Sequence, residues 1–197
     1  MTTPRVRSIA LDPSEDPALR PLPAPVADLL VTLAAPPRLV AHLRLVHDVA
    51  VRISDWTQRS YPSLRFDRDA VLFGAATHDI GKTVHPAELS GPGARHEEAG
   101  SALLLEHGVP ADLARFAASH ASWDDPATPV EDLLVSLADK VWKNKRVTGL
   151  EDRVVAALAQ AGGREPWDVF LELDAFLEGI GDTADERLAY QARHPTA

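Results

Sequence analysis

Apolar residues along this chain recur at the three- and four-residue spacing of helices, and no convincing run shows the alternation of a β-strand. The first helical stripe begins near Pro25 and is ended by the pair Pro36-Pro37. Asp67 is a suitable N-cap for a later helix that leads to His78, and Gly81 is expected to end that helix. Further helices are predicted over residues 38–58, 94–107, 110–122, 129–147, 150–161, 166–179 and 183–192. The pattern therefore predicts an all-α protein.

The N-terminal stretch differs from the rest in composition. Half of the 16 prolines fall within residues 1–37, and proline interrupts both helices and sheets. We therefore expect residues 1–24 to form an extended Pro-rich arm and residues 25–197 to form a single α-helical domain.

Composition limits the classes of protein that this chain represents. Apolar residues make up 45% of its 197 residues and charged residues 25%, no apolar run is long enough to span a membrane, and the start lacks the apolar core of a signal peptide. The absence of cysteine restricts metal ligands to nitrogen and oxygen, and together these features predict a cytoplasmic protein. A net charge of −9 disfavours binding to a nucleic-acid polymer, but leaves room for a small phosphorylated ligand at a local basic patch.

Histidine and aspartate residues are the most informative part of the sequence, above all the adjacent pair His78-Asp79. On the helix predicted at 38–58, His42 lies at the centre of the apolar arc, whereas His47 lies about 140° away, near the polar side. We therefore expect His42 to point inward and His47 to be partly solvated.

Three further residues of the ligand type are expected to point inward. His96 and His120 continue apolar stripes, and Asp139 lies on a helix that is apolar around most of its circumference. An unpaired carboxylate there would be costly, and a cation would compensate it. Each residue alone is more often explained by a hydrogen bond or an ion pair in the core than by a metal, but the whole set would need many independent partners.

Nitrogen and oxygen ligands together suit Mn, Fe, Co, Ni or Zn, and argue against a calcium site. His78 and Asp79 point about 100° apart on an ideal helix, so they meet on one ion only if it lies between them. Alternatively, Asp79 bridges two ions. The sequence thus predicts a divalent transition metal, with one or two ions.

Basic residues near these ligands are candidates for contact with phosphate. Lys82 lies just after the His-Asp pair, and Lys143 and Arg146 follow Asp139 on what is predicted to be the same helix. They would neutralise or attract an anionic substrate. A solvated surface role explains them as well.

His42, the pair His78-Asp79 and Asp139, with Ile80-Gly81-Lys82 after the pair, resemble the HD-domain superfamily of metal-dependent phosphohydrolases. The resemblance covers residues 37–147, leaving C-terminal helices at 150–192. It implies a compact helical bundle in which these four positions bind a divalent metal, and in which His96 and His120 hold a second ion or contact phosphate. The Gly-Tyr-Pro motif of the cyclic-di-GMP phosphodiesterases is absent, as is a long regulatory or nucleotidyltransferase domain, so the chain is most similar to small stand-alone members.

The resemblance implies hydrolysis of a phosphate ester or anhydride by metal-activated water, with Asp79 positioning the water and Lys82 assisting at the phosphoryl group. The substrate would be a small phosphorylated molecule such as a nucleotide or dinucleotide. Two alternatives remain open: a diiron oxygenase of the same fold, and a non-catalytic protein that binds metal or nucleotide. The apolar C-terminal helices either pack on the core or form the face of a homodimer.

Overall fold

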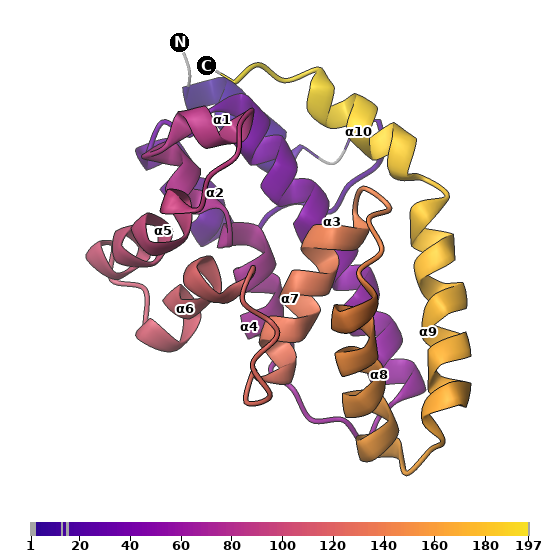
Figure 1. The fold of residues 1–197 in the computed structure, drawn as a ribbon. Helices are drawn as coiled ribbons and strands as arrows, with labels where there is room; N and C mark the ends of the chain where they lie inside the picture. Colours follow the sequence, from indigo (N-terminus) through magenta and orange to yellow (C-terminus); the bar gives the residue numbers. More distant parts are fainter. Residues whose placement is uncertain (1–2, 13, 15, 197) are drawn as a thin grey trace.

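The computed structural model describes residues 3–12, 14 and 16–196, and within them it contains helices and no strand, which confirms the predicted all-α fold. Ten α-helices follow one another along the chain (Figure 1), with the bounds α1 Thr3–Leu11, α2 Ala24–Thr32, α3 Pro37–Ser60, α4 Arg68–Thr77, α5 Arg95–Glu106, α6 Ala111–Ser119, α7 Val130–Val141, α8 Thr148–Gly162, α9 Pro166–Gly181 and α10 Ala184–Ala192. Two short 3₁₀ helices, η1 Ile80–Thr83 and η2 Pro86–Leu89, lie between α4 and α5.

The long helix α3 is the centre of the bundle and packs against α1, α4, α7 and α10 (Figure 1). Because these neighbours surround it, most of its residues are buried, the polar ones included. The expectation that His47 is partly solvated is therefore wrong. His47 is only 5% exposed, and burial lowers the pKa of its imidazole to about 4.

The extended N-terminal arm predicted for residues 1–24 is wrong over its first part, because Thr3–Leu11 form helix α1. Val6 and Ile9 of α1 are buried in the common core. Arg44 of α3, also fully buried, donates hydrogen bonds of 2.6–3.1 Å to four backbone carbonyls of this segment, those of Ile9, Asp12, Leu19 and Arg20. The segment thus covers the polar side of α3, and the division of the chain at residue 25 stays a prediction.

Helix α4 begins as predicted, since the side chain of Asp67 accepts a hydrogen bond of 3.0 Å from the backbone N–H of Ala70. It ends earlier than predicted, at Thr77, and the chain continues into η1. Gly81 has a different role, because a Cβ atom at this position would lie 2.0 Å from the carbonyl oxygen of His96. The missing side chain lets η1 approach the backbone of α5 closely, which brings Asp79 and His96 together.

Helix α7 ends at Val141, well before the predicted residue 147, and Asn144 follows with a positive φ of 56°. Lys143 and Arg146 therefore do not continue the helix that carries Asp139. Arg146 forms ion pairs of 2.7 Å with Glu151 and with Asp174, and so joins the start of α8 to α9.

The C-terminal helices pack largely on the core. Leu173 and Leu177 of α9 are buried, whereas Trp167 is 66% exposed and stacks on Phe170. The homodimer face stays a prediction. Among the described residues, no helix is long and apolar enough to cross a membrane.

Candidate metal centre

Six buried side chains of the ligand type converge at one place in the bundle, although they come from five separate parts of the chain. They are His42 of α3, His78 and Asp79 between α4 and η1, His96 of α5, His120 at the end of α6 and Asp139 of α7. All six residues that the sequence predicted as metal ligands are therefore neighbours. They fall into two triads that could each hold an ion.

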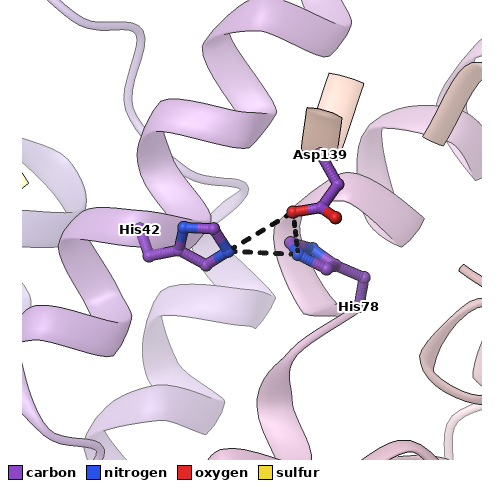
Figure 2. Close-up of side chains that lie close together, drawn as sticks. All are labelled: His42, His78 and Asp139. Carbon is purple, nitrogen blue, oxygen red and sulfur yellow. Dashed lines mark hydrogen bonds and ion pairs between the residues drawn. The ribbon is translucent and has the colours of Figure 1, made fainter. Parts of the chain in front are cut away.

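The first triad consists of His42, His78 and Asp139, whose side chains point toward one another (Figure 2). The two Nε2 atoms of the histidines lie 3.2 Å apart. Asp139 Oδ1 lies 3.8 Å from Nε2 of His42 and 3.4 Å from Nε2 of His78. Two imidazole nitrogens and one carboxylate oxygen thus face a common point, as ligands of a divalent ion do.

Asp79 belongs to the second triad, with His96 and His120, but its two oxygens face in different directions. Oδ1 lies 3.0 Å from Nε2 of His96 and 3.6 Å from Nε2 of His120. Oδ2 lies 3.1 Å from Nε2 of His42 and 3.6 Å from Nε2 of His78. A carboxylate in this position can bridge two ions, which is the alternative that the sequence left open for Asp79.

The hydrogen bonds around the histidines test whether a cation fits. Nδ1 of His78 lies 3.0 Å from the carbonyl oxygen of Ala75, and Nδ1 of His120 lies 3.0 Å from that of Ala117. Since a carbonyl only accepts, each Nδ1 carries the proton, and in the neutral ring each Nε2 turns a lone pair toward the carboxylates. A lone pair facing a carboxylate oxygen is unfavourable unless a positive charge lies between them. The donor set therefore fits divalent metal ions.

Glu88 of η2 supports the site from outside the ligand set. Its Oε2 lies 2.6 Å from Nδ1 of His96 and accepts a hydrogen bond of 3.1 Å from the backbone N–H of the same residue. Such a carboxylate orients a metal-binding histidine and makes its other nitrogen a better ligand. The sequence interpretation missed Glu88, because it lies in a single 3₁₀ turn, which is too short for periodicity to indicate which way a side chain points.

Burial and charge shift the pKa values of these groups in opposite directions. Burial lowers the pKa of His42, and that of His120 to about 4, so both rings are neutral near pH 7. Burial would also lower the pKa of His96, but the carboxylates of Asp79 and Glu88 outweigh it and raise that pKa. Burial alone would raise the pKa of Asp79, but hydrogen bonds from His42 and His96 help to hold it well below its usual range. The carboxylate is thus ionised and available to a cation.

Two lysines pair with the aspartates at the centre. Nζ of Lys82 lies 2.6 Å from Oδ2 of Asp79, and Nζ of Lys140 lies 2.6 Å from Oδ2 of Asp139. Lys82 is thus at the site, where the sequence predicted it. The sequence interpretation did not assign this contact to Lys140.

The site opens to the outside through a cavity of about 220 Å³, to which His42 and Asp79 contribute. Lys143 lines this cavity, and its contact with a substrate stays a prediction. Arg146 is not among the lining residues, and its ion pairs with Glu151 and Asp174 give it a structural role instead. Arg38, which the sequence did not indicate, also lines the cavity.

Comparison with known protein families gives one finding. The family model described as HD domain matches residues 39–142, which is more than half of the chain. The matched range contains all six ligand residues. Neither the search of curated proteins nor that of solved structures found a significant match.

Proposed function

Because this chain belongs to the HD-domain family, whose members are generally metal-dependent hydrolases, we propose that it is a phosphohydrolase acting on a small phosphorylated molecule. The observation that carries the proposal is the position of Asp79, whose two carboxylate oxygens face two different ligand triads. We propose that His42, His78, Asp79 and Asp139 hold one divalent ion, and that Asp79, His96 and His120 hold a second. The fit is to Mn, Fe, Co, Ni or Zn, since all of these accept imidazole and carboxylate ligands.

A bound divalent ion would supply a nucleophile, because it lowers the pKa of its water from 15.7 toward about 7, and it would also polarise a phosphoryl oxygen. The protein's own groups would then orient the reaction. Asp79 lines the cavity and faces both triads, so it would hold the attacking water by a hydrogen bond. Lys82 is bound to Asp79 and also lines the cavity, where its ammonium group would neutralise charge on the phosphoryl oxygens.

The same arrangement of ligands supports a second candidate, a diiron oxygenase of this fold, because Asp79 is placed to bridge two ions. The cavity favours hydrolysis of a phosphate compound. Three cationic side chains line it, those of Arg38, Lys82 and Lys143, and they would attract an anionic phosphoryl group. A neutral organic substrate of an oxygenase would gain nothing from this charge.

The experiment that tests the function combines metal analysis with an assay of phosphate release. The protein is purified with added Mn²⁺ or Fe²⁺, and inorganic phosphate is measured with a panel of nucleotides and dinucleotides. We expect His78→Ala and Asp79→Ala each to lose the bound metal and to lower kcat/KM by more than about 100-fold. This decrease is larger than the one usual for a residue that only supports a metal ligand. The exposed residues His107 and Asp69 provide the matched controls His107→Ala and Asp69→Ala, which should retain both.

Circular dichroism and thermal unfolding establish that each variant is folded. Unchanged phosphate release in both folded ligand variants would contradict the proposal. Iron-dependent consumption of O₂ with an organic substrate, and no phosphate release under any metal, would favour the oxygenase.

A further inference from the structure

Part of the cavity wall comes from outside the region that the family model matches. Arg38 precedes that region, Lys143 follows it, and Leu188 and Gln191 belong to α10, far toward the C-terminus. The six ligand-type residues of the two triads thus lie inside the matched range, whereas these four side chains lie outside it. The four residues are called the outer wall below.

Helix α10 is held firmly against the site. Arg187 is only 3% exposed and donates hydrogen bonds of 2.5 Å to the carbonyl of Trp142 and 2.7 Å to that of Ile180. Beyond the helix, the carbonyl of Pro195 accepts a hydrogen bond of 3.0 Å from the backbone N–H of Arg38. Since α10 is attached both to the end of α7 and to the start of α3, Leu188 and Gln191 form a fixed boundary of the cavity.

The charges of the outer wall are available to a ligand. Among the described residues, neither Arg38 nor Lys143 forms an ion pair, whereas the ammonium of Lys82 is already engaged with Asp79. Two cations without a carboxylate partner beside a metal centre fit the dianion of a phosphate group.

The remaining lining is suited to an organic group. Leu188 is 40% exposed although it is apolar, and Gln191 offers an amide that both donates and accepts hydrogen bonds. Trp142 also lines the cavity, and its buried Nε1–H has no hydrogen-bond partner among the described residues. A buried donor of this kind is normally satisfied by a water or a ligand.

From these contacts we infer that α10 is the specificity wall of the site, and that the substrate is a phosphomonoester of the size of a nucleoside monophosphate. Arg38 and Lys143 bind its phosphate, Leu188 packs against its organic group and Gln191 hydrogen-bonds the polar edge of that group. At about 220 Å³ the cavity lies below the range of roughly 300–1,000 Å³ usual for ligand pockets, which favours a small ligand over a dinucleotide. This inference rests on the proposed function.

The test measures binding separately from turnover. Adenosine, guanosine, cytidine and uridine 5′-monophosphates and glycerol 3-phosphate are titrated by calorimetry into the full chain in EDTA, and phosphate release is measured in parallel with Mn²⁺. We expect Leu188→Ala and Gln191→Ala each to raise the Kd of the most tightly bound nucleotide about tenfold. The Kd of glycerol 3-phosphate should change by no more than about twofold. Arg38→Met and Lys143→Met should weaken all five ligands about tenfold, because all five carry the phosphate.

Matched controls for the two α10 variants are Leu171→Ala and Gln58→Ala, exposed residues of the same types that do not line the cavity. Equal losses for nucleotides and glycerol 3-phosphate in the α10 variants, or no loss, would overturn the specificity wall. It would also be overturned if no nucleotide bound more tightly than glycerol 3-phosphate. If the variants show the expected binding pattern but no phosphate is released, the specificity role of α10 is supported and the phosphohydrolase activity is contradicted. If phosphate is released but the variants leave the selectivity unchanged, the activity is supported and the specificity role of α10 is contradicted.

Discussion

Helix α3 carries two buried polar clusters on opposite sides, since Arg44 and His42 lie about 200° apart around the helix. In the first, the guanidinium of Arg44 donates to four carbonyls of the N-terminal segment, so donors meet acceptors throughout. In the second, imidazole nitrogens and carboxylate oxygens face one another at 3.0–3.8 Å. Arg44 is fully buried and satisfied by the chain itself, whereas the second cluster adjoins the cavity and is satisfied by the chain only in part, through Lys82 and Lys140.

This difference distinguishes a structural cluster from a functional one. Burial of polar groups is favourable only when their hydrogen bonds are made, so a folded protein normally pairs them internally. The Arg44 cluster follows this rule and needs nothing else. The ligand cluster departs from it, and a divalent cation is what would complete it. Four changes would test this contrast, in order of decreasing expected effect.

The largest effect is expected for Arg44→Met, which leaves four carbonyls without their donor. Each unsatisfied buried group costs about 1–3 kcal/mol, so the free energy of unfolding should fall by at least about 3 kcal/mol. Urea unfolding measures the change, with Arg59→Met as the control, because Arg59 is an exposed arginine of the same helix. A midpoint equal to that of the control would show that the Arg44 cluster contributes no stability.

The next largest effect is expected on adding metal. A divalent ion should stabilise the ligand cluster, whereas the Arg44 cluster has no site for one. At a free metal concentration of 100 times Kd, an ion adds about 2.7 kcal/mol to the free energy of unfolding. For a chain of this length that corresponds to a rise in Tm of about 5–10 °C. Differential scanning calorimetry should show this rise with Mn²⁺ or Zn²⁺ in the wild type and a smaller rise in Asp139→Asn, which keeps the residues of the second triad. An equal rise in both would locate the ion elsewhere.

A smaller effect is expected for Glu88→Gln, which removes the charge from the partner of His96 and keeps its shape. Metal affinity should weaken about 10–100-fold, equivalent to about 1.4–2.7 kcal/mol, because the histidine becomes a poorer ligand. Titration against a competing chelator measures Kd. The control is Glu98→Gln, because Glu98 is an exposed glutamate of α5. Identical Kd values for the two variants would show that Glu88 does not support metal binding.

The smallest effect belongs to a polar cluster around the exposed residue Glu172, which Arg164 and the hydroxyl of the buried Tyr61 contact at 2.8 Å and 2.7 Å. These contacts lower the pKa of Glu172 from 4.5 to about 2. Its contribution to stability is therefore present above pH 4.5 and lost as the pH falls toward 2. Glu172→Gln should lower Tm by under about 2 °C at pH 6, because solvent screens exposed pairs, and the difference should vanish near pH 2. A larger change in Tm would show that the Glu172 cluster contributes as much to stability as a buried cluster does, despite the exposure of Glu172.

The sequence located the ligand set well because its evidence was local. His42 and Asp139 lie on strongly amphipathic helices, and the pair His78-Asp79 is visible as adjacent residues. Helix periodicity shows which way such side chains point. The same reasoning was wrong for His47, because wheel position separates inside from outside only when one side of a helix faces water. Helix α3 has no such side.

The amino-acid sequence by itself determined the all-α fold and singled out the six side chains of the ligand type, since periodicity and residue chemistry act over a few neighbouring positions. Only the tertiary structure decided that the N-terminal segment forms α1 and covers Arg44, that Glu88 supports His96, and that α10 closes the cavity. These contacts join residues far apart in the chain or located in irregular loops. Their energy comes from the pairing of buried polar groups across the fold, which no local pattern records.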